Sequence, residues 1–101
     1  MSKELEIVEL FLQYKDLLTK HQQKLVEDYY VFDLSLGEIS ENFNISRQGV
    51  YDALKKAKNQ LFEYENKLKL KEKNDLLKTI HQNLLAKGFK EEAEEILKVI
   101  K

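Results

Sequence analysis

Residues 35 to 61 read SLGEISENFNISRQGVYDALKKAKNQL, and they carry the clearest helix start and turn signals in the chain. Ser35 is followed three residues later by Glu38, the spacing of a capping box, so a short helix is predicted to start directly after Ser35. Ser46 is a second good N-cap and predicts another helix from the next residue on. Asn44 stands between the two helices, and after Gly it is Asn that best tolerates a left-handed backbone. The stretch therefore predicts a helix-turn-helix.

The apolar side chains of this stretch are spaced to form one core. Small Ser40 is predicted where the two helices cross closely. Gly49 lies in the first turn of the second helix, where glycine costs about 1 kcal/mol relative to alanine. We therefore expect a backbone to approach Gly49 closely, either that of DNA or that of a neighbouring helix. The predicted core residues are Ile39, Phe43, Ile45, Val50, Ala53 and Leu54.

The second helix of such a motif lies in the major groove of DNA, with its N-terminal residues facing the base edges. Arg can bind guanine bidentately, Gln can pair with adenine, and Ser, Tyr and Lys can anchor phosphates. Asp52 opposes binding unless it accepts from cytosine or pairs with Lys55 or Lys56. The alternative is a helical hairpin that binds only protein. The predicted DNA-binding residues are Ser46, Arg47, Gln48, Tyr51, Asp52, Lys55 and Lys58.

The composition predicts an all-α protein. The 101 residues include no proline, no cysteine and three glycines, and helix interiors disfavour proline and glycine. Without cysteine, disulfides, thiolate zinc sites and cysteine nucleophiles are excluded, and a reducing cytoplasm is the expected location. No apolar run is long enough for a membrane span, and acidic residues occupy the N-terminus where a signal peptide carries basic ones.

Charge is distributed unevenly along the chain. Residues 1 to 45 carry four Lys/Arg and nine Asp/Glu, residues 46 to 73 carry eight and four, and residues 74 to 101 carry five and five. The middle segment is therefore basic, with a net charge of +4, inside a nearly neutral protein. Phosphates attract local positive charge, so this segment favours nucleic-acid contact, although many Lys-rich helices are simply solvated.

Three segments carry a resemblance to a known family: SLGEISE, NISRQGVYDAL and YENKL at Tyr64 to Leu68. Together with LLTKHQQKLVEDYY, they make roughly residues 3 to 73 resemble the YlxM-like family of small bacterial helix-turn-helix proteins. That family's motif is similar to the sigma-factor region that reads promoter DNA. Its genes lie beside those for the signal recognition particle GTPase and its receptor. The resemblance therefore implies a role in that targeting pathway or in its regulation.

Two apolar stripes cover well over half of the predicted first helix. Leu5 and Leu12 lie on one stripe, and Ile7 and Tyr14 lie on the other. A helix this apolar needs two partners: one is its own domain, and the other is either a second subunit or more of the same chain. A second helix begins at Thr19, in capping-box spacing with Gln22, and ends near Phe32 or Asp33. Its predicted buried face comprises Leu25, Val26, Tyr29, Tyr30 and Phe32.

The second motif helix is predicted to run from Arg47 to about Lys71, because its apolar stripe continues through Leu68. Its distal half could pack on the chain's own termini or on a partner subunit. Asn74 is the predicted N-cap of a C-terminal helical hairpin that turns at Gly88. The hairpin's apolar stripes comprise Leu76, Leu77, Ile80 and Leu84, then Phe89, Ala93, Ile96, Leu97 and Ile100.

These patterns predict a helix-turn-helix DNA-binding domain over residues 1–73 and a hairpin extension over residues 74–101, which packs on that domain or on a partner subunit. The expected function is sequence-specific regulation through double-stranded DNA, by a homodimer. The alternative is a non-enzymatic adaptor for protein or RNA of the targeting particle. His21 and His81 lie far apart, and no phosphate loop, metal spacing or nucleophile motif occurs, so neither enzyme activity nor a cofactor is expected.

Overall fold

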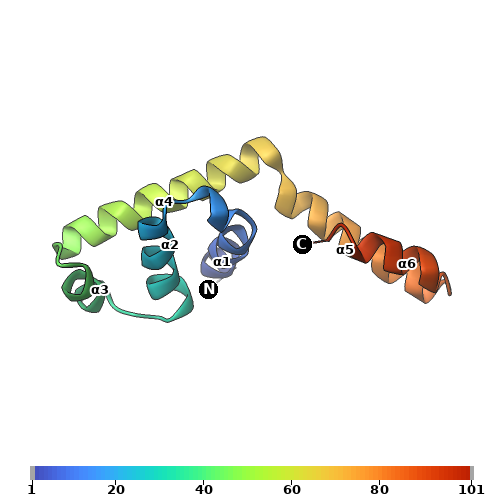
Figure 1. Cartoon of the computed structure of the whole chain (residues 1–101), viewed down its shortest axis with the longest axis horizontal. Coiled ribbons are helices and arrows are strands. Elements are labelled where there is room, and N and C mark those ends of the chain that lie inside the picture. Colours follow the sequence, from blue (N-terminus) through green and yellow to red (C-terminus); the bar gives the residue numbers. More distant parts are fainter. Residues whose placement is uncertain (1, 101) are drawn as a thin grey trace. The chain divides into compact units, whose positions relative to one another are not determined.

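The computed structural model describes residues 2 to 100 (Figure 1). These residues form six α-helices and two short helical segments, and they contain no strand, which confirms the predicted all-α class. The chain divides into two compact units, one reaching to Lys67 and one beginning at Leu68. The elements are α1 (Ser2–Tyr14), η1 (Lys15–Leu17), α2 (Lys20–Val26), η2 (Glu27–Val31), α3 (Leu36–Phe43), α4 (Arg47–Leu68), α5 (Leu70–Ala86) and α6 (Lys90–Leu97).

Both predicted capping boxes are present. The Thr19 hydroxyl accepts from the Gln22 backbone N–H at 3.1 Å, and the Gln22 side chain accepts from the Thr19 N–H at 3.0 Å. Ser35 and Glu38 make the same reciprocal pair, both bonds at 3.1 Å. Each box satisfies two backbone donors that a helix start would otherwise leave unpaired. The starts of α2 and α3 are thereby fixed locally.

The first unit has a single apolar core. Helices α1, α2 and α3 all lie along one side of α4 in Figure 1. Leu36, Phe43, Ala53 and Tyr64 are partly buried against this core. The buried residues that form it are Ile7, Leu10, Phe11, Tyr14, Leu18, Leu25, Val26, Ile39, Val50, Leu54, Ala57 and Leu61. The α1 stripe of Ile7 and Tyr14 and the α4 stripe as far as Leu61 therefore face this core, whereas Leu5 and Leu12 on the other α1 stripe are exposed.

Two residues predicted in the core are exposed instead. Phe32 is 58% exposed, because η2 is a π-helix in which the Phe32 N–H bonds back to the Glu27 carbonyl at 3.0 Å. The wider turn moves the apolar stripe out of register, and Leu34 packs against the core instead. Ile45 is also exposed, at 39%. It directly follows the left-handed Asn44, whose φ of 55° redirects the chain.

The distal half of α4 packs on its own chain, which is the first of the two predicted alternatives. The Tyr14 hydroxyl donates to Glu65 Oε1 at 2.6 Å, and the Gln22 side-chain amide donates to Gln60 Oε1 at 2.6 Å. The Tyr64 hydroxyl reaches the Leu17 carbonyl at 3.3 Å. These polar contacts hold α4 against the segment from α1 to α2.

Helix α4 is slightly shorter than predicted, and the predicted N-cap at Asn74 is wrong. Helix α4 ends at Leu68, because Lys69 adopts a left-handed backbone with a φ of 56°. The next helix starts immediately afterwards, and the Lys73 N–H bonds to the Lys69 carbonyl at 3.0 Å. Asn74 is therefore inside α5 and is not its N-cap. A side-chain cap contributes only about 1 kcal/mol, which does not outweigh another hydrogen-bonded helical turn.

The second unit is the predicted hairpin of α5 and α6. Gly88 turns the chain with a φ of 87°, and the Phe89 N–H bonds to the Leu84 carbonyl at 2.9 Å. Ala93 is fully buried, and its carbonyl lies 2.9 Å from His81 Nδ1. The predicted stripes are only partly buried, because short α6 covers a narrow face of α5. The apolar residues left exposed include Leu76, Ile80, Leu85, Phe89, Leu97 and Val99.

Candidate nucleic-acid interface

The predicted recognition helix α4 begins at a hydroxyl cap. The Ser46 hydroxyl accepts from the Gly49 backbone N–H at 2.9 Å, and the Ser46 carbonyl accepts from the Val50 N–H at 3.0 Å. Before it, the Ile45 N–H bonds to the Ser40 carbonyl at 3.1 Å across the left-handed turn at Asn44. The turn and the cap together set the direction in which α4 leaves α3. Since Ser46 accepts through its oxygen, its hydroxyl proton stays available as a donor.

Gly49 is tightly surrounded, but by different groups from those predicted. A β-carbon at Gly49 would lie 3.2 Å from Ser46 Oγ and 3.8 Å from the Ile45 side chain. The close neighbours are therefore side chains of the turn itself, and neither a backbone of DNA nor one of another helix is needed to explain the glycine. The N-cap hydroxyl occupies the space that a larger residue would need.

Arg47 lies over the first turn of α3. A β-carbon at Gly37 would be 3.0 Å from Arg47 Nη2 and 3.2 Å from Cζ, so the guanidinium rests against the bare glycine backbone. The Arg47 side chain is nevertheless exposed. It bridges the two motif helices on their outer side and remains free to turn outward.

Gln48 and Asp52 are bonded to each other on the exposed face of α4. The Gln48 side-chain amide donates to Asp52 Oδ1 at 3.0 Å. Pairing with Lys55 or Lys56 was one of the two conditions under which Asp52 would tolerate DNA, and none of the ion pairs found within residues 2–100 joins them. Residues four apart on a helix face one another, so the pair forms without help from another element. It presents an amide and a carboxylate together.

The lysines of the first three turns of α4 have no acidic partner in the described part of the chain. Lys55 and Lys56 are exposed and Lys58 is half-buried. By contrast, Lys67 pairs with Glu63 at 2.9 Å and Lys71 pairs with Asp75 at 2.9 Å. Unpaired ammonium groups can neutralise phosphates without first breaking an internal ion pair. Within α4, the lysines that have no internal ion pair therefore lie toward its start, whereas Lys67 near its end is paired.

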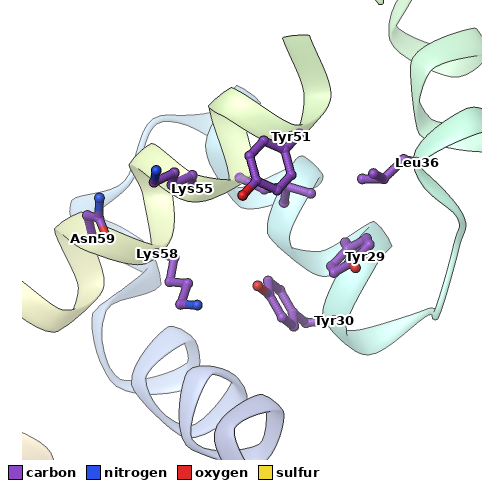
Figure 2. Close-up of a pocket in the computed structure, with 8 residues that line it drawn as sticks. Tyr29, Tyr30, Leu36, Tyr51, Lys55, Lys58 and Asn59 are labelled. Atoms are coloured by element: carbon purple, nitrogen blue, oxygen red, sulfur yellow. The ribbon is translucent and has the colours of Figure 1, made fainter. Parts of the chain in front are cut away.

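A pocket of about 190 Å³ lies beside this part of α4, between it, η2 and the start of α3 (Figure 2). Tyr29 and Tyr30 were predicted to be buried, but both are half-buried and line the pocket. Their rings meet edge to face, with centroids 4.9 Å apart. The signal that could have revealed the pocket is the adjacent pair of tyrosines, whose polar tips do not suit a dry core. The pocket is lined by Tyr29, Tyr30, Leu36, Tyr51, Leu54, Lys55, Lys58 and Asn59.

The seven predicted DNA-binding residues are thus all placed on or next to the first three turns of α4. Tyr51, Lys55 and Lys58 share the pocket, whereas Gln48 and Asp52 form a separate bonded pair. Among residues 2 to 100, no group of three His, Cys, Asp or Glu side chains is arranged to hold a metal ion. No helix within the same range is both long enough and apolar enough to cross a membrane.

Two capped helices joined by a left-handed Asn turn, with the second helix carrying exposed polar and basic residues, define a helix-turn-helix protein. The chain belongs to the UPF0122 family of YlxM/p13-like helix-turn-helix proteins, whose sequence profile matches residues 1–100. This confirms the resemblance seen in the sequence.

Several family members are close relatives of the chain. A UPF0122 protein of Malacoplasma penetrans is 40% identical over 104 residues, covering 95% of this chain and 97% of the relative. The YlxM protein of Bacillus subtilis is 45% identical over 87 residues, covering 84% of this chain and 79% of the relative. A UPF0122 protein of Mycoplasma mycoides is 51% identical over 77 residues, covering 76% of this chain and 68% of the relative.

Proposed function

We propose that this protein is a sequence-specific DNA-binding regulator that inserts the first three turns of α4 into the major groove. The observation that carries this proposal is the concentration of exposed polar and unpaired basic side chains at the N-terminal end of a capped second motif helix. Helix-turn-helix proteins read bases with this part of the motif. The likeness of the family's motif to a promoter-reading sigma-factor region points the same way.

The proposed base readers are Arg47 and the Gln48–Asp52 pair. Arg47 reaches guanine by turning away from Gly37, and this movement breaks no ion pair found in the described chain. Gln48 and Asp52 together offer a donor for adenine or an acceptor for cytosine. The proposed phosphate contacts come from Ser46, Tyr51, Lys55 and Lys58.

Selection of binding sites from a random DNA library, with the purified full chain, tests this function. Enrichment of one sequence would support a regulator, and a palindrome would add two-fold symmetry. Failure to enrich any sequence, together with salt-independent or absent duplex binding, would contradict it. A variant carrying Arg47→Ala and Gln48→Ala is the matched control, because it keeps the lysines and should lose enrichment while it retains weak general binding.

We also propose that the protein is a homodimer built on α1. Leu5 is 60% exposed and Leu12 is 56% exposed, so the second apolar stripe of α1 has no cover within the described chain. A dimer would present two recognition helices to two half-sites. Sedimentation at tens of micromolar should give twice the 12.0 kDa chain mass, and Leu12→Glu should halve it. A wild-type mass of one chain would contradict the dimer.

The second candidate function is a non-enzymatic adaptor that binds protein or RNA, with the signal recognition particle pathway as its setting. The observation that favours a protein partner is the run of exposed apolar side chains on α5 and α6, including Leu76, Leu85 and Leu97. We propose that residues up to Lys67 form the DNA-binding domain and that the hairpin is an extension for a partner or a second subunit. Binding to purified targeting-particle RNA or GTPase, without any duplex binding, would favour the adaptor.

A further inference from the structure

The pocket beside α4 collects hydrogen-bond donors that have no partner in the described chain. Tyr29, Tyr30, Tyr51, Lys55 and Lys58 line it, and no hydrogen bond or ion pair found within residues 2–100 satisfies their hydroxyl and ammonium groups. The hydroxyls of Tyr29 and Tyr30 and the ammonium group of Lys58 are not fully buried, so each can bond to water or to an acceptor that enters the pocket. Donors gathered beside one pocket without a protein partner offer a place for an acceptor.

The side chains in Figure 2 show how these donors are arranged. The Tyr30 hydroxyl and the Lys58 ammonium lie on the same side of the pocket, and the Tyr51 ring lies above them. Lys55 and Asn59 continue along the same face of α4. Lys58 is half-buried and forms no ion pair within residues 2–100, so its ammonium group can bind an anion at this place without first breaking an internal pair.

Size limits what the pocket can hold. Its volume of about 190 Å³ is below the roughly 300 to 1,000 Å³ of pockets that enclose a whole small-molecule ligand. The pocket therefore suits one group of a larger molecule. A tetrahedral phosphate, whose oxygens accept several hydrogen bonds at once, matches the Lys58 ammonium group together with the Tyr30 and Tyr51 hydroxyls.

Tyr29 and Tyr30 also lie between this pocket and a second pocket that is lined by acidic residues. Tyr29, Tyr30 and Leu36 line both, and the second pocket adds Glu4, Asp33, Glu38 and other residues. Burial, with smaller contributions from Tyr29 and Glu4, raises the pKa of Tyr30 above its usual 10.0. The Tyr30 hydroxyl therefore stays protonated and remains a donor at neutral pH.

We propose that this pocket is a phosphate seat that takes one backbone phosphodiester of bound DNA, with Lys58 and the Tyr30 and Tyr51 hydroxyls as its donors. The proposal rests on the proposed function for the source of the phosphate. It adds η2, an element outside the two motif helices, to the interface. It also assigns Tyr30, which the sequence pattern placed in the core, a binding role.

The test measures duplex affinity of the full chain and of three variants. Tyr30→Phe removes one hydroxyl and keeps the ring, and it should weaken binding to any duplex about tenfold without changing the salt slope, because no charge is lost. Lys58→Gln should weaken binding and reduce the slope of log K against log salt by about one. Lys56→Gln is the control on the same helix, since Lys56 does not line the pocket. The change in duplex affinity caused by Lys56→Gln should be the same in the wild-type protein and in the Tyr30→Phe variant.

Replacing single phosphates of the duplex by neutral methylphosphonates identifies the seat. At one position, the replacement should abolish the difference between wild type and Tyr30→Phe, because the hydroxyl has lost its acceptor. If the losses of affinity caused by Tyr30→Phe and by the methylphosphonate add at every position, while the duplex still binds, the proposal is overturned. Unchanged affinity of both Tyr30→Phe and Lys58→Gln would overturn it as well.

The same pocket could take a phosphate of the DNA backbone or that of a free nucleotide. Titration with adenosine monophosphate, followed through the nuclear magnetic resonance signals of the tyrosine rings, distinguishes these two sources. Saturable shifts of Tyr30 and Tyr51 without any duplex binding would support the seat and contradict the DNA-binding function. Duplex binding that leaves both rings and both variants unaffected would uphold the function and refute the seat. If neither ligand moves the rings, the seat is refuted.

Discussion

The guanidinium of Arg47 rests on Gly37, so closely that a β-carbon there would lie 3.0 Å from Arg47 Nη2. This contact joins the first turn of α3 to the first turn of α4, which are the two helices of the motif. In the free protein, Arg47, the main candidate for reading a base, therefore lies against α3. Binding requires the side chain to turn outward.

Gly37→Ala should raise the stability of the first unit. Gly37 is helical, and Ala is favoured over Gly in helices by up to about 1 kcal/mol. The atom in the way is the end of a flexible side chain, so Arg47 can shift. Thermal denaturation followed by circular dichroism should show a rise of up to about 4 to 8 °C. A clear fall would show that Arg47 is held in place.

Arg47→Ala should cost about 1 to 3 kcal/mol in specific DNA binding and relax the preference at one base pair. The reason is the loss of a bidentate contact, which neutral side chains cannot replace. Fluorescence anisotropy with the selected site and with single-base variants measures both effects. Equal affinity of mutant and wild type for the selected site would remove Arg47 from the base readers.

Asp52→Asn should tighten binding to duplexes of unrelated sequence by a few fold. The carboxylate repels phosphates, whereas Asn keeps an oxygen that can accept from Gln48. The bond from Gln48 at 3.0 Å is expected to survive the change. Competition binding at two salt concentrations measures the gain, which should shrink at high salt because screening weakens the repulsion. Weaker binding would show that Asp52 contacts the DNA favourably.

Replacement of Lys55 and Lys58 by Gln should weaken specific and general duplex binding and flatten the salt slope by about one unit per lost phosphate contact. Lys69→Gln with Lys73→Gln is the matched pair, because neither residue lies within α4 and the groove-binding proposal gives them no role. A larger effect from Lys69 and Lys73 on the salt slope would contradict insertion of the N-terminal turns of α4.

Glu38→Gln should make the protein less sensitive to acid. Hydrogen bonds from the Ser35 backbone N–H, and then from its side chain, hold the pKa of Glu38 below its usual 4.5. Because the folded pKa is the lower one, the stabilisation is fully present above pH 4.5 and is lost as the pH falls through the folded value. Gln can serve in the same box, as Gln22 does with Thr19. Melting temperatures between neutral pH and pH 3 should fall less for the variant; an equal fall would contradict this role.

Local sequence signals predicted the motif well. Thr19, Ser35 and Ser46 are caps and Asn44 is the left-handed turn, because each requirement is met by a residue and its neighbours within a few positions. The errors lie where backbone geometry departs from the ordinary α-helix. The π-helical η2 exposes Phe32, and the left-handed backbone of Lys69 ends α4 at a residue type that gives no warning.

The candidate site was predictable as a set of residues but not as an arrangement. The exposed face of α4 follows from helical spacing, so Gln48, Tyr51 and Lys55 could be named from the sequence. Arg47 on Gly37 and the pocket built with Tyr30 depend on contacts between separate elements. Such contacts follow from how the helices pack, which periodicity within one helix does not specify.

All five tyrosines of the chain precede Leu68, and the chain contains no tryptophan. Ultraviolet fluorescence of the unmodified protein therefore comes almost entirely from the first compact unit, whereas the far-ultraviolet circular dichroism signal sums the helices of both units. Denaturation recorded by the two signals on one sample compares the cooperativity of the units without labels or truncation. Coincident curves would mean that the motif and the hairpin unfold as one, and separated curves would give each unit its own free energy of unfolding.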